Sequence, residues 1–282
     1  MDFVVGLPRT QRKFDAVWVI VDMLTKPAHF IPVAVTYSSE QFAEIYIREI
    51  VPLHGVPVSV ISNRGWKYCY PIIVVDGTFL KSSHRGTMLT ASAQDAAGKI
   101  FPLAYAVVDS ENDSSWECFF EMFRQAFGER ERMCIVSDRH ASILRDASIV
   151  YLEVFHYVCI FHLWNNIKKQ FKKNHDRPRE VFFAMARAYK IEDFNRLMQD
   201  MDNIDKRVSG YMFLIGYEKW SLAHFTVNRS MARTSNIAES LNARNREARE
   251  LPITSLLDYM MNLVMEWNNT NRMTAMSTFT GL

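Results

Sequence analysis

The sequence predicts a mixed α/β fold, and three observations along the chain lead to that expectation. Residues 72–80 form a short apolar run rich in β-branched side chains, which is typical of a strand buried on both faces. Two more strand patterns follow at 86–93 and 100–108, and an amphipathic helix pattern covers 112–127. After a further short strand at 134–137, the pattern becomes mostly helical.

An RNase H-like mixed sheet is expected from the order of these elements. Three strands are followed by a helix and then by a strand that ends at a carboxylate, Asp138. A helical insertion is expected over about 163–232, and Ser114 is the expected cap of the helix at 112–127. Beyond Asp138 we expect helices at 156–173, 178–190, 191–201 and 205–217, then C-terminal helices from Asn236 and over 253–267.

The bulk composition is that of a soluble globular protein with a hydrophobic core. The chain has 282 residues, 49% of them hydrophobic and 23% charged, and its net charge of +2 neither requires nor excludes a nucleic-acid partner. The four cysteines are scattered without a Cys-x-x-Cys pair, so we expect a reducing intracellular compartment. No apolar run approaches the roughly 20 residues of a membrane helix, and no signal peptide is expected.

The first 65 residues carry a separate set of patterns. Strands are expected at 14–24, 29–35 and 58–61, with a helix over 38–53. The resemblance to other proteins here is carried by MDFVVGLP at 1–8, VIVDMLTK at 19–26 and ISNRG at 61–65. This segment resembles the start of the integrase catalytic core of gypsy-type retrotransposons.

The integrase resemblance implies that Asp2 is the first metal-binding carboxylate and that an acidic residue should stand at position 63. The chain has Asn63 there, and a neutral amide cannot replace an anionic ligand in a two-metal site. We therefore interpret residues 1–65 as a truncated integrase fragment without activity, followed by a second domain over 66–282. The sequence leaves open whether the fragment adds strands to the edge of the main sheet or stays loose.

Three carboxylates stand out in the second domain. Asp76 lies inside the buried strand 72–80, where a carboxylate is costly without a partner such as a cation. Asp138 and Glu239 supply two further hard oxygen ligands, of the kind that Mg²⁺ and Mn²⁺ prefer.

A second resemblance covers about 200 residues of the chain. It is carried by VDGTFLK at 75–81, FPLA at 101–104, DSEN at 109–112, SW at 115–116, SDRH at 137–140, CIFHL at 159–163 and TSNIAESLN at 234–242. These pieces closely resemble a plant Mutator-like element (MULE) transposase domain. The resemblance implies a DDE-type transposase with Asp76, Asp138 and Glu239 as its catalytic acids, which bind Mg²⁺ or Mn²⁺ and cleave and transfer DNA strands.

Each acid also has a structural explanation. Asp76 with Gly77 could open a turn, and Asp138 could cap the helix that starts near His140. Glu239 stands three residues after Asn236, which is the spacing of a capping box.

The pair Cys159 and His162 lies one turn after His156, and this spacing suggests a zinc site. One cysteine without a second pair does not complete a four-ligand site, so we expect packing or a place near the active site for both residues.

DNA is the expected partner. Basic residues could contact phosphates or form a solvated helix face. The predicted contacts are Lys168, Lys169, Lys172 and Lys173, with Arg177 and Arg179 nearby, and Arg244, Arg246 and Arg249 on the helix of Glu239.

The resemblance further implies a nuclear protein that assembles as a homo-oligomer on paired DNA ends. Mutator-like transposases usually carry an N-terminal DNA-binding region and a C-terminal SWIM-type zinc finger, neither of which the sequence displays. The alternatives are therefore a non-catalytic DNA-binding or regulatory protein and an inert relic, both derived from a transposase.

Overall fold

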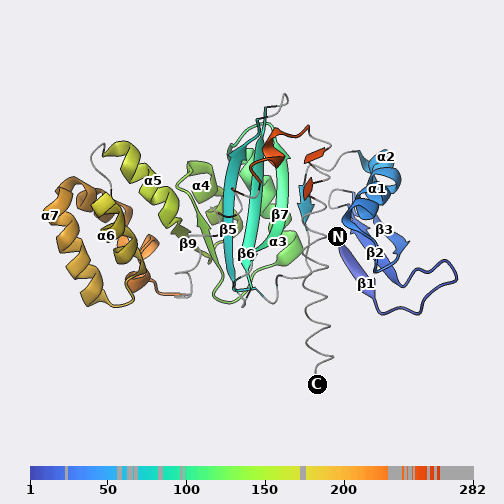
Figure 1. The fold of residues 1–282 in the computed structure, drawn as a ribbon, viewed down its shortest axis with the longest axis horizontal. Helices are drawn as coiled ribbons and strands as arrows, with labels where there is room; N and C mark the ends of the chain where they lie inside the picture. Colours follow the sequence, from blue (N-terminus) through green and yellow to red (C-terminus); the bar gives the residue numbers. More distant parts are fainter. Residues whose placement is uncertain are drawn as a thin grey trace, which may run out of the picture.

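The protein, seen in a computed structural model, contains two β-sheets and a group of helices (Figure 1). The predicted mixed α/β class is confirmed: six strands form a mixed sheet in the order β4-β7-β6-β5-β8-β9, and β1-β2-β3 form a second sheet. The structure describes residues 1–22, 25–55, 59–61, 66, 69–81, 85–95, 98, 100–171, 176–227, 237, 240, 243, 245–252, 255–256 and 259–260.

The small sheet is an antiparallel meander covered by one helix. Its strands are β1 (Asp2–Val5), β2 (Ala16–Val21) and β3 (Ala28–Val33). Helix α1 (Ser39–Glu49) begins at a capping box formed by Ser38 and Gln41, and α2 (Val51–His54) follows. Trp18 is fully buried between sheet and helix, where its ring packs against Phe3 and Phe42. Alternation along β2 thus provides the apolar face that α1 covers.

The N-terminal segment is joined to the large sheet through β4 (Ser59–Ile61). This strand pairs antiparallel with β7 at the sheet edge. Val60 belongs to the same buried cluster as Trp18, and the Met1 amino group donates a hydrogen bond of 3.0 Å to the carbonyl of Ile61. Of the two ways of packing that the sequence left open, the structure has the first: the segment adds a strand to the main sheet.

Strand β5 (Ile72–Phe79) lies in the interior of the large sheet, between β6 and β8. It pairs antiparallel with β6 (Thr87–Gln94), which pairs in turn with β7 (Ile100–Val108). On its other side it runs parallel to β8 (Cys134–Ser137) and, beyond that, β9 (Phe155–Val158).

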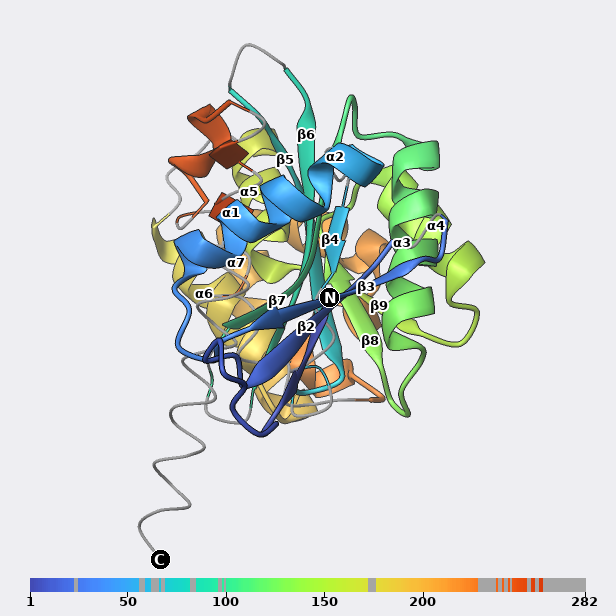
Figure 2. The same ribbon diagram turned by 90° about the vertical axis from the view of Figure 1, so that its right-hand side faces the viewer.

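Helices cover both faces of the large sheet (Figure 2). On one face lie α3 (Asp113–Phe127) and α4 (Ala141–Val150). The apolar face of the predicted amphipathic helix is an aromatic stripe of α3, and it is buried there. Its cap is Asn112, not Ser114, because the Asn112 side chain accepts the Ser115 backbone N–H.

The other side of the sheet meets the helical part of the chain. It comprises α5 (Ile160–Gln170), α6 (Asp176–Arg187), α7 (Ile191–Ile215) and three 3₁₀ turns, η2 (Tyr217–Lys219), η3 (Leu222–His224) and η5 (Ala248–Glu250). The helix predicted from residue 156 is wrong at its start, because residues 155–158 pair with β8 as a strand. Helix α7 is continuous across the two predicted helices, with a kink at Asp205.

Buried aromatic side chains hold the helical part together. Trp220 is 1% exposed and stacks on Phe182 of α6. Of the predicted C-terminal helix at 253–267, Leu256 and Met260 are buried against strand residues such as Met88, while Trp267 lies outside the described residues. No helix within the described ranges is long and apolar enough to cross a membrane.

Candidate functional site

Asp76 is the buried carboxylate at the centre of the site. It lies in β5 opposite Thr90 of β6, and the residue is 7% exposed. Its backbone carbonyl accepts the Thr90 hydroxyl at 3.2 Å. The turn reading of Asp76 and Gly77 is wrong, because β5 continues through Gly77 to Phe79.

Asp138 follows β8 directly, and the strand register brings it beside Asp76. Val74 of β5 pairs with Val136 of β8 in parallel, and each aspartate stands two residues further along its strand. Neighbouring strands lie about 4.8 Å apart, and residues two apart face the same way. Val74 and Val136 share one buried cluster, so the two carboxylates belong to that same sheet face.

Asp138 has a second, local role. Its Oδ1 accepts the backbone N–H of His140 at 3.0 Å, while His140 itself is the N-cap of α4. The N-cap of α4 is therefore His140, two residues after Asp138, which the sequence suggested as the cap. The hydrogen bond turns the chain after β8 and leaves the other carboxylate oxygen, Oδ2, outside this contact.

Cys159 lies beside Asp138 at the end of the next strand, β9. Ser137 pairs with Val158 of β9, and the next residues, Asp138 and Cys159, continue that register. The Cys159 backbone N–H donates to the Ser137 carbonyl at 2.7 Å, and the buried Cys159 is the N-cap of α5.

His162, in the first turn of α5, is electrostatically linked to both aspartates. Burial alone lowers its pKa, but the hydrogen bond and electrostatic interaction with Cys159, together with the negative charges of Asp76 and Asp138, outweigh that effect and raise the pKa to about 9. Its buried Nδ1 atom has no hydrogen-bond partner among the residues that the structure describes. The site therefore holds an imidazolium against an aspartate pair at neutral pH.

His156 lies behind Asp138 on β9. Its Nε2 is 2.7 Å from the Ser137 hydroxyl, which also contacts the Asp138 carbonyl at 2.5 Å. Burial lowers the pKa of His156 to about 4, against the opposing effect of the Asp138 charge. His156 is therefore neutral at physiological pH and acts as a hydrogen-bonding neighbour.

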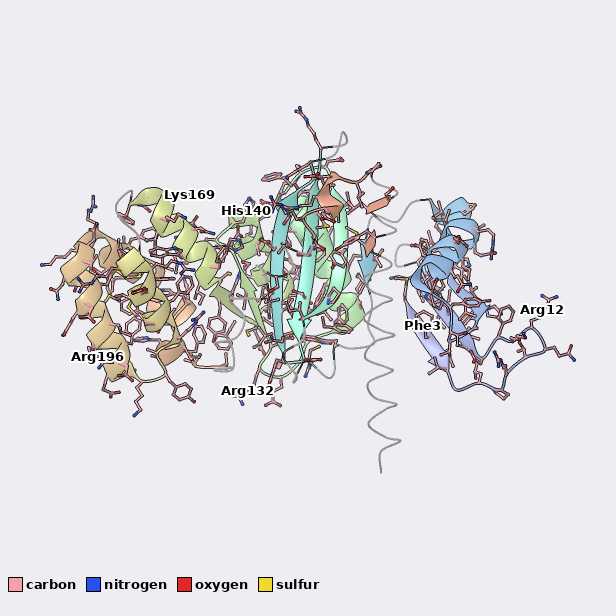
Figure 3. The ribbon with its side chains drawn as sticks, viewed as in Figure 1. Phe3, Arg12, Arg132, His140, Lys169 and Arg196 are labelled. Atoms are coloured by element: carbon pink, nitrogen blue, oxygen red, sulfur yellow. The ribbon has the colours of Figure 1, made fainter. Side chains whose placement is uncertain are left out.

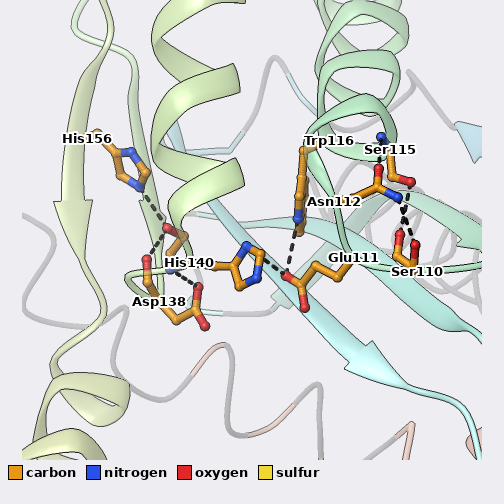
Figure 4. A network of polar contacts seen from close by, with 9 residues as sticks. Ser110, Glu111, Asn112, Ser115, Trp116, Asp138, His140 and His156 are labelled. Atoms are coloured by element: carbon orange, nitrogen blue, oxygen red, sulfur yellow. Dashed lines mark hydrogen bonds and ion pairs between the residues drawn. The ribbon is translucent and has the colours of Figure 1, made fainter.

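A network of polar contacts reaches the Asp138 segment from α3 (Figure 4). Glu111 Oε1 accepts the indole N–H of Trp116 at 3.2 Å and lies 3.9 Å from His140 Nδ1. Glu111 and His140 are not among the predicted site residues. Their signal is that each stands within three residues of a strand end, Val108 or Ser137, beside the aspartate strands.

The third predicted acid, Glu239, lies outside the described residues, as does Asn236. Ile237 is described, and it packs in the cluster that contains Val74 and Val136. Among the residues whose placement is described, no group of three or more His, Cys, Asp and Glu side chains could hold a metal ion. Asp76 and Asp138 are suitable oxygen donors, but they need a third ligand to complete a site.

The predicted DNA contacts are only partly covered. Lys168 and Lys169 are exposed in the last turn of α5, where Figure 3 labels Lys169. Arg246 is exposed and Arg249 half-buried, but they lie in a turn and in η5, not on one helix as predicted. Lys172, Lys173 and Arg244 lie outside the described residues.

Comparison with known proteins identifies one domain. The family model described as MULE transposase domain matches residues 72–166, which include Asp76, Asp138 and His162. Among solved structures, the chain is similar to a chain of the simian T-cell lymphotropic virus intasome in complex with the PP2A regulatory subunit B56 gamma, solved by cryo-electron microscopy. That similarity has 10% sequence identity, a TM-score of 0.25, and coverage of 68% of this chain and 67% of the other.

Proposed function

We propose that this chain is the catalytic core of a DDE-type transposase with an RNase H-like fold. One observation carries the proposal: the register of the neighbouring strands β5 and β8 brings Asp76, inside β5, and Asp138, directly after β8, to one sheet face, within the segment that matches the MULE transposase domain. The reaction is metal-dependent cleavage of DNA phosphodiester bonds at transposon ends, followed by transfer of the strand to target DNA.

In this proposal Asp76 and Asp138 hold Mg²⁺ or Mn²⁺. When bound, such ions activate an attacking oxygen and stabilise a leaving oxygen at phosphorus. The chain's own part is to fix the carboxylates. Asp76 is held by its pairing with Thr90 of β6, and Asp138 by the N–H of His140. Protonated His162 offsets their negative charge while no cation is bound.

Glu239 is the third acid of the proposal. Ile237, two residues earlier, packs with Val74 and Val136, and Ala248, nine residues later, packs with Leu80 and Met88. Both contacts lie against strands next to Asp76. These two contacts, on either side of Glu239 in the sequence, support Glu239 as the proposed third ligand.

We infer that DNA is the partner, with Lys168 and Lys169 among its phosphate contacts. Both ammonium groups are exposed and without an acidic partner among the described contacts. The proposed core would act in the nucleus and as a homo-oligomer, because transposition joins two DNA ends.

We also infer that residues 1–65 derive from a gypsy-type integrase core. The motifs at 1–8, 19–26 and 61–65 support this origin, and the antiparallel meander followed by α1 agrees with it. Asn63 lies outside the described residues, and we assign the segment no catalytic role.

The decisive test is nicking of supercoiled DNA by the purified chain in Mg²⁺ or Mn²⁺. We expect Asp138→Asn to reduce metal-dependent nicking by at least about 100-fold, because the charge that holds the cation is lost. Asp200→Asn is the matched control, since Asp200 is exposed on α7 and far along the chain from the site.

Equal nicking by Asp138→Asn and the wild type would overturn the catalytic proposal. Salt-sensitive DNA binding without nicking by the wild type would instead favour the non-catalytic DNA-binding protein.

A further inference from the structure

Glu111 contacts three elements that meet behind the aspartate pair. It lies between β7 and α3, with only 12% of its side chain exposed. Its Oε1 accepts the Trp116 indole N–H of α3 and faces His140 Nδ1 at the start of α4. A carboxylate that is buried this far needs such partners, and few are present among the described residues.

The third element is β5, which Glu111 meets at Gly77. A Cβ built on Gly77 would lie 2.5 Å from Glu111 Oε1, 2.7 Å from Cδ and 2.9 Å from Oε2. Gly77 has no positive φ, so its backbone does not require glycine. The carboxylate of Glu111 occupies the space that a side chain at position 77 would need.

The side of the sheet decides what Glu111 can do. Successive residues of a strand face opposite ways, so Gly77 faces α3 and α4 while Asp76 faces α5. Glu111 is thus behind the strand and is not a ligand beside Asp76. Its connection to the site runs through His140, whose backbone N–H donates to Asp138 Oδ1.

We propose that Glu111 is a positioning residue that locks the segment from Asp138 to His140 against β5 and so keeps Asp138 in line with Asp76. Glu111 contacts Gly77, which follows Asp76, and it faces His140, whose backbone N–H donates to Asp138. The proposal deepens the transposase function above and rests on it for its catalytic consequence.

Amide hydrogen exchange at His140 tests the positioning directly, without DNA. In Glu111→Ala we expect that amide to exchange about 10-fold faster or more, because its hydrogen bond to Asp138 opens more often. The amide of Leu144, which donates to the His140 carbonyl inside α4, should change less. Glu121→Gln is the control, because Glu121 is an exposed carboxylate on α3, the helix that follows Glu111.

Gly77→Ala provides a second variant that leaves the charge of Glu111 in place. The added methyl group has to displace the Glu111 carboxylate from Trp116, so the His140 amide should again exchange faster. In the Glu111→Ala background the same Gly77→Ala change should have little further effect, because the space is then open. This non-additivity is the signature of a direct contact.

The catalytic consequence is measured by metal-dependent nicking. A carboxylate displaced by about 1 Å is expected to reduce the rate about 10–100-fold at saturating metal, in Glu111→Ala and in Gly77→Ala. Faster exchange at His140 in a protein that never nicks DNA would uphold the positioning role and refute the transposase. Unchanged exchange in both variants, or additive effects in the double variant, would overturn the role of Glu111.

Discussion

At the scale of single residues, the charges around Asp76 and Asp138 are the distinctive feature of this protein. Two histidines flank the pair and carry opposite pKa shifts. The interactions with Cys159 and the two aspartates raise the pKa of His162 to about 9, whereas burial lowers the pKa of His156 to about 4. The two residues should therefore affect folding stability at opposite ends of the pH range.

His162 should stabilise the fold below neutral pH and lose that effect in alkali. Its pKa in the folded protein is about 9, above its ordinary value of 6.5, so the folded state binds the proton more tightly. The contribution is complete below about pH 6.5 and disappears as pH rises through 9. Urea unfolding with EDTA present, from pH 6 to 10, should show this loss in the wild type and a flatter profile in His162→Gln. Parallel profiles would contradict the assignment.

His156 predicts the reverse behaviour in acid. Its folded-state pKa of about 4 lies below 6.5, so the unfolded chain takes up this proton first. The stability that neutral His156 supports is complete above about pH 6.5 and is lost as pH falls through 4. His156→Gln keeps a donor for Ser137 and should reduce the pH dependence of the unfolding free energy between pH 6.5 and 4. A variant as acid-sensitive as the wild type would exclude His156 as the cause.

At the scale of elements, apolar periodicity predicted most of the large sheet and its α3 cover. Strands β5, β7 and β8 and helix α3 lie where the patterns indicate. Strand β9 was missed because its four residues also fit the period of the helix that follows. Only the parallel partner β8 decides that they are extended. The cap of α3 was misplaced by two residues, within the usual uncertainty of helix ends.

Helix α3 should contribute strongly to stability through its buried aromatic side chains. Phe120 is 1% exposed between the sheet and α4, so Phe120→Ala should reduce the free energy of unfolding by about 3–5 kcal/mol. Phe79→Ala is the matched control: Phe79 is 72% exposed on β5, and its loss should cost less than about 1 kcal/mol. Urea titration measures both. Similar costs for the two variants would mean that α3 does not pack on the sheet in solution.

At the scale of the whole molecule, two segments of different resemblance share one sheet. Strand β4 belongs to the N-terminal segment, yet it forms the outer partner of β7 in the large sheet. A domain division at residue 65 therefore separates β4 from its partner strand β7 in the large sheet, although the sequence pattern changes at that residue.

Removal of residues 1–65 should harm the rest of the chain. Without β4, the edge of β7 around Tyr105 has no partner strand on that side, and unpaired edges promote association. We expect a lower melting temperature and self-association of the truncated chain in light-scattering chromatography, compared with the full chain. A truncated chain that keeps the melting temperature and the oligomeric state of the full chain would show that β4 is dispensable.

The sequence by itself determined the buried strand of Asp76, the strand end at Asp138 and the aromatic stripe of α3. These features depend on the order of apolar and polar residues over short distances, which periodicity records. Only the tertiary structure decided that β4 joins the large sheet, that residues 155–158 form a strand, and that Glu111 lies against Gly77. Each of these depends on a partner far away in the chain, and local patterns carry no information about which partner a strand edge or a carboxylate will meet.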